Sequence, residues 1–108
     1  MTFHVNVLYP NSDDATFDMP YYLKTHMPLV KDKWTSFGLK GYTVVQAQPG
    51  PDGAKPQYSV QATLIWDKAD DVGKAMSDGA STGEIMGDIP NFSNKQPVFV
   101  SGDVVGSD

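Results

Sequence analysis

The chain has 108 residues, the usual length of one domain, and we expect residues 1–108 to fold as a single domain without disulfides. It contains no cysteine, which excludes thiol nucleophiles and thiolate metal ligands. All eight basic residues are lysines, and 13 acidic residues give a net charge of −5, which argues against nucleic acid as a partner. No apolar run approaches the ~18 residues of a membrane span and no secretory leader opens the chain, so we expect no membrane partner and a cytoplasmic location.

The first half of the chain predicts a strand followed by a long helix. Residues 2–9 alternate with a period of two, which is typical of a strand. One side of this strand is apolar and the other mixed: Phe3, Val5, Val7 and Tyr9 against His4, Asn6 and Leu8. Residues 19–37 then show three- and four-residue spacing of apolar side chains: Met19, Leu23, Met27, Val30, Trp34 and Phe37. Asp18 or Thr16 is expected to cap this helix and Gly38 to end it.

Pro28 interrupts the helical pattern. Its ring removes the hydrogen bond to the carbonyl of Lys24 and disfavours helical angles at Met27. We therefore expect a kink or a break at this point.

Two further strands are predicted over residues 42–48 and 58–66. The intervening segment 49–56 contains three prolines and two glycines, so we expect an antiparallel hairpin with an exposed, tolerant tip.

The second helical region is predicted to contain two segments. Asp67 should cap the first, and Gly79 should end it. The apolar face of this segment consists of Ala69, Val72 and Met76. Ser81 and Glu84 have the spacing of a capping box, which predicts a short second segment that Pro90 stops.

A last predicted strand over residues 97–105 completes a β-α-β-β-α-β order. This is the ferredoxin-like α+β plan, in which helices cover one face of an antiparallel sheet. We expect Phe3, Val5 and Val7 to lie beneath the helices. The bare face would then present His4, Asn6, Leu8, Gln61, Thr63 and Ile65. A half-apolar bare face favours a partner, so we expect a homodimer with its sheets face to face and a pocket between them or under the helices.

Two stretches resemble the EthD family. Residues 17–30, FDMPYYLKTHMPLV, resemble the signature of that family, in which an aromatic pair is followed by a histidine, a proline and a Leu-Val step. Residues 86–92, MGDIPNF, resemble its second characteristic stretch, ahead of the final strand. The element order and length also agree, so the resemblance covers essentially the whole chain.

The resemblance implies a fold and a range of activities. It implies a dimeric α+β barrel, formed when two ferredoxin-like subunits pack their sheets together. The family is named for a protein associated with bacterial ethyl tert-butyl ether degradation beside an oxygenase system. Related branches resemble cofactor-free enzymes acting on polyketides, and the wider superfamily includes lactone isomerases, monooxygenases and haem-degrading proteins.

His26 and Tyr22 are the candidate catalytic residues. They lie one helical turn apart at the border of the apolar stripe, whereas Tyr21 is predicted to point away from it. The pKa of a histidine lies near neutrality, so His26 could move a proton, and the Tyr22 phenol could donate a hydrogen bond to a carbonyl or oxyanion. The alternatives are structural: His26 would bind a backbone carbonyl freed by Pro28, and Tyr22 would be a core residue.

The remaining candidates have weaker support. The predicted pocket residues on the bare sheet face are His4, Asn6, Gln61 and Thr63, which would otherwise only meet the dimer partner. Asp88 is a possible supporting acid, although a turn hydrogen bond near Pro90 also explains it. No paired-histidine or nucleotide-binding motif occurs, so we expect neither a metal nor a cofactor.

Three functions remain open at this point. The first is a small cofactor-free enzyme in a catabolic or secondary-metabolite pathway, with His26 as acid or base acting on a small apolar carbonyl-containing or cyclic metabolite. The second is a non-catalytic module that binds such a metabolite beside an oxygenase system. The third is a haem or oxygen-handling barrel, which would need an axial ligand facing a flat slot. Catalysis requires His26 to face a cavity with a polar partner, whereas binding requires only the cavity.

Overall fold

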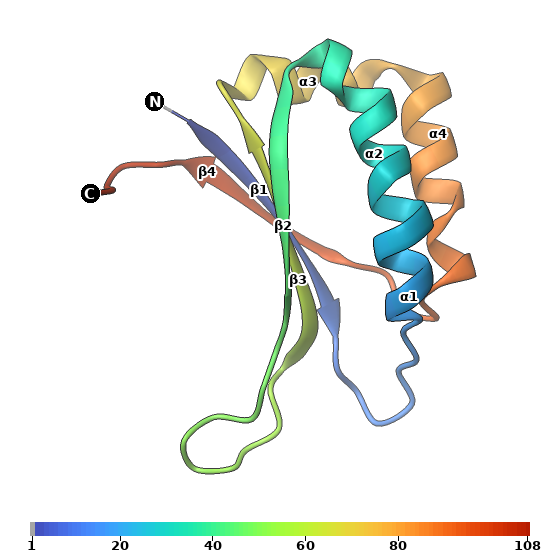
Figure 1. Cartoon of the computed structure of the whole chain (residues 1–108), viewed down its shortest axis with the longest axis vertical. Coiled ribbons are helices and arrows are strands. Elements are labelled where there is room, and N and C mark those ends of the chain that lie inside the picture. Colours follow the sequence, from blue (N-terminus) through green and yellow to red (C-terminus); the bar gives the residue numbers. More distant parts are fainter. Residues whose placement is uncertain (1) are drawn as a thin grey trace.

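The computed structural model describes residues 2–108, which form a four-stranded sheet with helices on one side (Figure 1). The elements follow the chain as β1 (Phe3–Pro10), α1 (Met19–Tyr21), the π-helical turn η1 (Tyr22–His26), α2 (Met27–Trp34), the 3-10 turn η2 (Thr35–Phe37), β2 (Leu39–Gln46), β3 (Tyr58–Trp66), α3 (Ala69–Ser77), α4 (Gly79–Gly87), the 3-10 turn η3 (Ile89–Asn91) and β4 (Val98–Asp103). The predicted ferredoxin-like α+β fold is confirmed by this order.

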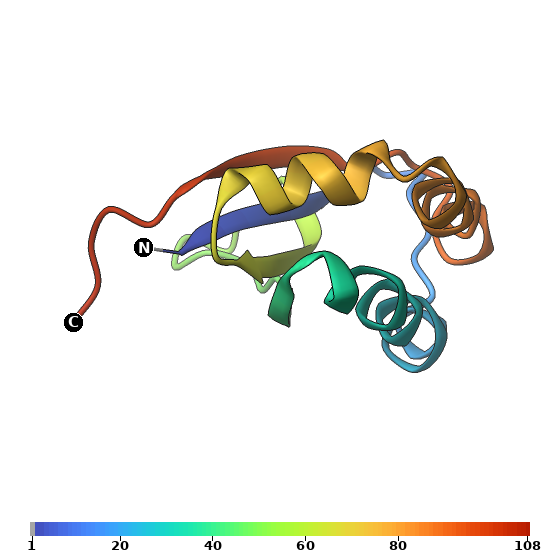
Figure 2. The same ribbon diagram turned by 90° about the horizontal axis from the view of Figure 1, so that it is seen from above.

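The sheet is antiparallel, with strand order β2-β3-β1-β4. The two central strands pair Val5 with Leu64 and Val7 with Ala62, and all four side chains are buried. Phe3 is partly buried on the same face. Seen from above, α2 and α4 lie side by side (Figure 2). The predicted assignment of the helix-covered face is therefore correct.

The opposite side of the sheet is its open face, which no helix of the described chain covers (Figure 1). Because directly paired residues of antiparallel strands point to the same side, the register fixes its members. They are His4, Asn6 and Leu8 on β1, Thr43 and Val45 on β2, Gln61, Thr63 and Ile65 on β3, and Val98 and Val100 on β4. The open face thus combines exposed apolar side chains with a polar centre, as predicted.

Helical backbone runs through Pro28 without a break. The backbone angles of His26 and Met27 are helical, and the N–H of Met27 donates to the carbonyl of Tyr22, five residues earlier. This wider π-helical turn accommodates the missing N–H of Pro28. The ends agree with the prediction, because Asp18 accepts a hydrogen bond from the N–H of Tyr21 and Gly38 adopts a left-handed φ of 118°.

The π turn changes which side chains the long helix buries. Leu23, a predicted member of the apolar stripe, is 46% exposed, whereas Tyr22 is 1% and His26 is 4% exposed. A π turn holds one residue more than an α turn, so the side chains before Pro28 rotate relative to those after it. The residues that follow the turn, Met27 and Val30, are buried as predicted.

The start of α3 differs from the prediction. No side chain caps it, and Lys68 occupies the position before the first helical residue. Asp67 instead forms an exposed ion pair with Lys40, with 3.3 Å between the Asp67 Oδ2 and Lys40 Nζ atoms. Ala75 is the buried residue of this helix, whereas Met76 is 41% exposed, so the predicted apolar face is only partly correct.

Gly79 begins α4 rather than ending α3. Asp78 caps α4 by accepting a hydrogen bond from the N–H of Ser81 at 3.2 Å, so the predicted capping box at Ser81 and Glu84 is wrong. Pro90 lies within η3, directly after α4. Within residues 2–108 no helix is both long and apolar enough to cross a membrane.

Candidate active site

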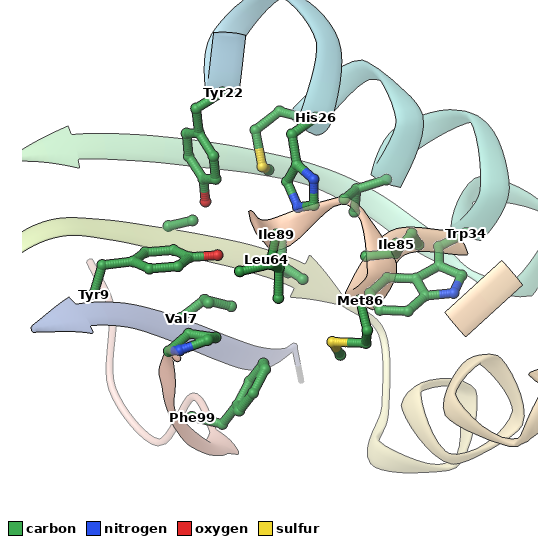
Figure 3. Close-up of a pocket in the computed structure, with 14 residues that line it drawn as sticks. Val7, Tyr9, Tyr22, His26, Trp34, Leu64, Ile85, Met86, Ile89 and Phe99 are labelled. Atoms are coloured by element: carbon green, nitrogen blue, oxygen red, sulfur yellow. The ribbon is translucent and has the colours of Figure 1, made fainter. Parts of the chain in front are cut away.

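A small cavity lies between the helices and the covered face of the sheet (Figure 3). Its volume is about 30 Å³, which is enough space for one or two water molecules. Its lining is mostly apolar: Val7, Tyr9, Tyr22, His26, Met27, Val30, Trp34, Ala62, Leu64, Ile85, Met86, Ile89, Pro97 and Phe99. In this state the cavity is too small for a small organic ligand and smaller still relative to a flat macrocycle such as haem.

His26 reaches this cavity from the end of the π turn (Figure 3). Its ring stacks on that of Tyr22, with 5.4 Å between centroids and 14° between planes. The ring of Phe92 also packs against His26, with 4.5 Å between the two centroids. Two aromatic neighbours therefore fix the orientation of the imidazole.

The carboxylate of Asp88 bonds the Nδ1 atom of His26. The Nδ1 atom of His26 lies 2.9 Å from Oδ2 of Asp88, whose side chain is only 12% exposed. The other carboxylate oxygen, Oδ1, accepts hydrogen bonds from the Tyr21 hydroxyl at 2.6 Å and from Nδ2 of Asn91 at 2.9 Å. Asp88 can make all three hydrogen bonds because it lies between α4 and η3, facing the π turn.

The electrostatics of the pair define the state of His26. Burial alone would raise the pKa of Asp88, but the hydrogen bonds from Tyr21, Asn91 and His26 outweigh burial and lower it. Burial lowers the pKa of His26, and the Asp88 carboxylate opposes this only in part. Near neutral pH the pair is thus an uncharged imidazole beside a carboxylate.

This state fixes the tautomer of the ring. An ionised carboxylate only accepts hydrogen bonds, so Nδ1 of His26 must carry the ring proton and donate a hydrogen bond to Asp88. The Nε2 atom then has a free lone pair, and it has no hydrogen-bond partner in the part of the chain that the structure describes. The arrangement can accept a proton at Nε2 while Asp88 stabilises the imidazolium that forms.

Two phenols complete the polar part of the cavity. Burial is the main cause that raises the pKa of both Tyr9 and Tyr22 well above the usual value of 10.0, so both hydroxyls stay protonated. Tyr22 comes from the π turn and Tyr9 from β1, and both side chains reach the cavity (Figure 3). A protonated phenol beside a base can donate a hydrogen bond to a substrate oxygen.

The structure brings three of the predicted site residues together. His26 and Tyr22 line the same cavity, and Asp88 bonds His26 while also accepting the turn hydrogen bond from Asn91, so the role of Asp88 as a supporting acid stays a prediction. The alternative in which His26 binds a backbone carbonyl freed by Pro28 is wrong, because Nδ1 is bonded to Asp88. The structural alternative for Tyr22 is partly correct, since its ring also belongs to the core.

The other predicted pocket residues lie elsewhere. His4, Asn6, Gln61 and Thr63 are all on the open face, on the far side of the sheet from His26. There the Thr63 hydroxyl donates to Oδ1 of Asn6 at 2.7 Å. These four residues line a pocket only if a second sheet covers the open face, which stays a prediction.

Sequence reasoning missed Tyr21 and Tyr9. Tyr21 was predicted to point away from the site, but its hydroxyl bonds to Asp88. Ordinary helical spacing could not place it, because the π turn is not visible in the sequence. Tyr9 was placed on the covered face but was not linked to the site. That link depends on β1 lying under the π turn, which is a tertiary contact. Among residues 2–108 no group of three or more His, Cys, Asp or Glu side chains is arranged to hold a metal ion.

Comparison with solved structures finds proteins that are similar over essentially the whole chain. An EthD-like protein from Ralstonia eutropha JMP134 is 34% identical with a TM-score of 0.88, over 99% of this chain and 95% of that one. An ethyl tert-butyl ether (EthD) family protein from Bacillus halodurans C-125 is 19% identical with a TM-score of 0.75, over 97% of this chain and all of that one (100%). A dimeric ferredoxin-like protein from Jannaschia sp. CCS1 is 12% identical with a TM-score of 0.63, over 95% and 98% of the two chains, and shares the fold. Protein-family models and curated proteins give no match.

Proposed function

The chain belongs to the EthD family, and we propose that it is an enzyme that uses His26 as an acid or base on a small apolar carbonyl-containing or cyclic metabolite. The observation that carries this proposal is the His26–Asp88 pair at the wall of an apolar cavity. An uncharged imidazole with a carboxylate on Nδ1 and a free Nε2 is the arrangement a general base needs. We place the reaction in a catabolic or secondary-metabolite pathway.

The proposed step is proton transfer next to a carbonyl group. Nε2 of His26 takes a proton from the carbon beside the carbonyl. The electron pair of that C–H bond forms a C=C bond to the carbonyl carbon, and the π electrons of the C=O bond move to the oxygen. Tyr22 donates a hydrogen bond to that oxygen as its negative charge develops. Asp88 stabilises the imidazolium until the proton is returned to the product, so Asp88 itself stays ionised throughout.

The lining supports an apolar, uncharged substrate. Of the described residues that form the cavity wall, none is a lysine, and His26 is the single group that titrates near neutral pH. A buried anionic substrate would have no cation to pair with, and its desolvation would be costly. The cavity walls therefore favour neutral molecules.

Entry of such a molecule requires the cavity to open. At about 30 Å³ the cavity is smaller than the 300–1,000 Å³ of typical ligand sites. Phe99 on the edge strand β4 is 48% exposed, and the partly buried Met86 has a flexible side chain. We propose that these two side chains move aside to admit the substrate.

We also propose that two copies pair through their open faces. Five apolar side chains lie on that face: Leu8, Val45, Ile65, Val98 and Val100. Three of them are at least 40% exposed in the single chain. Two of the structures that share this fold are described as dimeric ferredoxin-like proteins, which supports the same assembly here.

A second candidate function is non-catalytic binding of a small apolar metabolite, as an accessory module beside an oxygenase system such as one for ether degradation. The apolar character of most of the cavity wall favours it. Binding requires only the cavity, whereas catalysis also requires the lone pair on Nε2 of His26. The two functions therefore predict different results for a variant that lacks the imidazole.

Hydrogen–deuterium exchange at carbon separates the two candidates. Cyclohexanone and acetophenone, two small neutral ketones, would be incubated with the protein in D₂O, and loss of their α-proton signals followed by NMR. We expect wild-type protein to accelerate exchange and His26→Ala to lose at least about 100-fold of that acceleration. Val105→Ala is the control, because Val105 is 89% exposed in the C-terminal tail, away from the cavity and the open face. Equal exchange with His26→Ala, together with retained ketone binding, would favour the binding module.

Native mass spectrometry of protein purified from its own host supports this assay. It reports the assembly and any co-purifying small molecule in one measurement. A neutral, apolar co-purifying molecule would identify the substrate class directly, and a carboxylate would contradict the assignment made from the cavity wall.

A further inference from the structure

The carboxylate of Asp88 forms hydrogen bonds with two side chains, His26 and Tyr21. Oδ2 faces Nδ1 of His26 at 2.9 Å, and Oδ1 faces the hydroxyl of Tyr21 at 2.6 Å. We propose that Tyr21 is a positioning residue, whose hydroxyl shares the Asp88 carboxylate with His26 and so keeps the imidazole an uncharged base. This inference rests on the proposed function for its purpose, but its physical content concerns His26 alone.

The Tyr21 contact has the geometry of a strong hydrogen bond. Its 2.6 Å separation lies in the 2.5–2.7 Å range of a hydroxyl bonded to an ionised oxygen. The ring of Tyr21 stacks on Phe92 at 6.3 Å between centroids and 25° between planes, which holds the hydroxyl in line with Asp88. Asn91 supports both partners, since its Nδ2 donates to Asp88 at 2.9 Å and lies 3.4 Å from the Tyr21 hydroxyl.

Sharing the carboxylate weakens its effect on His26. A carboxylate that accepts hydrogen bonds on Oδ1 holds less charge for the proton on Nδ1 of His26. If Asp88 bonded His26 alone, its charge would favour the imidazolium more strongly and oppose the effect of burial more fully. With Tyr21 bonded to Oδ1, Asp88 can orient the imidazole of His26 through Oδ2 without also favouring its protonated form as strongly.

Few other groups act on His26 from the surrounding elements. Tyr22 faces it from its own helix, Tyr9 lines the same cavity from β1, and burial keeps both of these phenols protonated and uncharged. Asp88, on the α4 and η3 side, is the one charged group found to act on His26 within residues 2–108. Removing the Tyr21 hydroxyl should therefore change the titration of His26 through Asp88.

The test is the NMR titration of His26 in Tyr21→Phe. This variant keeps the ring that stacks on Phe92 and deletes only the hydroxyl, so the protein should fold. We expect the pKa of His26 to rise relative to wild type, and the acidic limb of any His26-dependent ketone exchange to move to higher pH by the same interval.

Tyr58→Phe is the matched control, because it removes a tyrosine hydroxyl on β3, where Tyr58 pairs with Pro10 and does not line the His26 cavity. It should leave the titration of His26 unchanged. A His26 pKa in Tyr21→Phe that is unchanged or lower than in wild type would overturn the inference. A second variant, Asn91→Ala, should also raise the pKa of His26, since it removes the other donor to Oδ1 of Asp88.

The outcome is separable from that of the proposed function. If ketone exchange is absent in wild-type protein but the pKa of His26 rises in Tyr21→Phe, the proposed reaction fails while the role of Tyr21 stands. If exchange depends on His26 but its titration does not respond to Tyr21, the reaction stands and this inference fails.

Discussion

Asp88 has two effects on His26 that a single substitution can separate. As a carboxylate it favours the charged ring, and as an acceptor it fixes the proton on Nδ1. Asp88→Asn removes the charge while keeping the size of the side chain. Burial is then left unopposed, so we expect the pKa of His26 to fall further. We also expect His26-dependent ketone exchange to fall by about 100-fold, because the imidazolium loses its stabilising partner.

The measurement for Asp88→Asn is the same histidine titration, combined with the exchange rate. A His26 pKa that rises in this variant would show that another group, and not Asp88, supplies the favourable charge.

The depressed pKa of His26 also makes folding stability depend on pH. The unfolded chain protonates this histidine near its ordinary pKa of 6.5, whereas the folded protein resists protonation because the ring is buried. The unfolded state therefore binds more protons as pH falls below 6.5, and the free energy of unfolding decreases until the folded pKa is passed. The lowered pKa of Asp88 acts in the same direction at more acidic pH.

Urea unfolding at pH 7 and pH 5 tests this dependence. We expect wild-type protein to be less stable at pH 5, and His26→Gln to lose the part of the decrease that lies just below pH 6.5. His4→Gln is the control that should retain it. Identical pH dependence in wild type and His26→Gln would contradict the burial of a neutral imidazole.

At the scale of elements, the sequence predicted the strands better than the helix surfaces. β3 begins and ends where its alternation predicts, because a period of two allows little ambiguity once one face is buried. The long helix has the predicted ends, and it buries the predicted side chains after the π turn but not Leu23 within it. The π turn before Pro28 places His26 against Phe92 and Asp88, and neither contact is local in sequence.

The same limit applies to the site. His26 and Tyr22 could be predicted because they lie in one helical turn. Asp88 carried only a weak signal from its place in the second family-like stretch, 62 positions from His26. Tyr21 could not be found, since its contribution depends on the rotation that the π turn imposes.

The loop between β2 and β3 provides a prediction about an element that contributes little to the core. Residues 49–55 are exposed, and within them Gly53 adopts a left-handed φ of 76° in a turn closed by its N–H and the carbonyl of Gly50. Replacing residues 50–54 with a two-residue Gly-Ser linker keeps Lys55 and its ion pair with Asp13. We expect the free energy of unfolding to change by less than about 1 kcal/mol.

Soluble yield and urea unfolding of the shortened chain check this expectation. Loss of soluble protein would show that the loop packs against another surface, such as a second copy of the chain.

At the scale of the whole molecule, the sheet is covered on one side only. A four-stranded sheet needs an apolar layer against its second face unless that face is polar, and here it is mixed. Val100 illustrates the problem: it lies on the edge strand β4, pairs with Asn6 and is 53% exposed in the single chain. A second copy placed face to face would bury this side chain together with Leu8 and Ile65.

Val100→Lys should therefore weaken the dimer without unfolding the subunit. A lysine at this position remains hydrated in the monomer, but a face-to-face dimer would bury its charge without a partner. We expect at least a tenfold increase in the dissociation constant of the dimer, measured by sedimentation equilibrium at micromolar concentration. Val105→Lys is the matched control, because Val105 is 89% exposed in the C-terminal tail after β4.

Sedimentation of the wild-type protein is the first test of the face-to-face dimer. If it sediments as an 11.8 kDa monomer at micromolar concentration, the face-to-face dimer is wrong, whatever the variants do. If wild type and Val105→Lys are dimers and Val100→Lys is a monomer, the interface includes β4 and the open face. If all three are dimers of equal affinity, the contact lies elsewhere, and His4, Asn6, Gln61 and Thr63 have no second sheet with which to form a pocket.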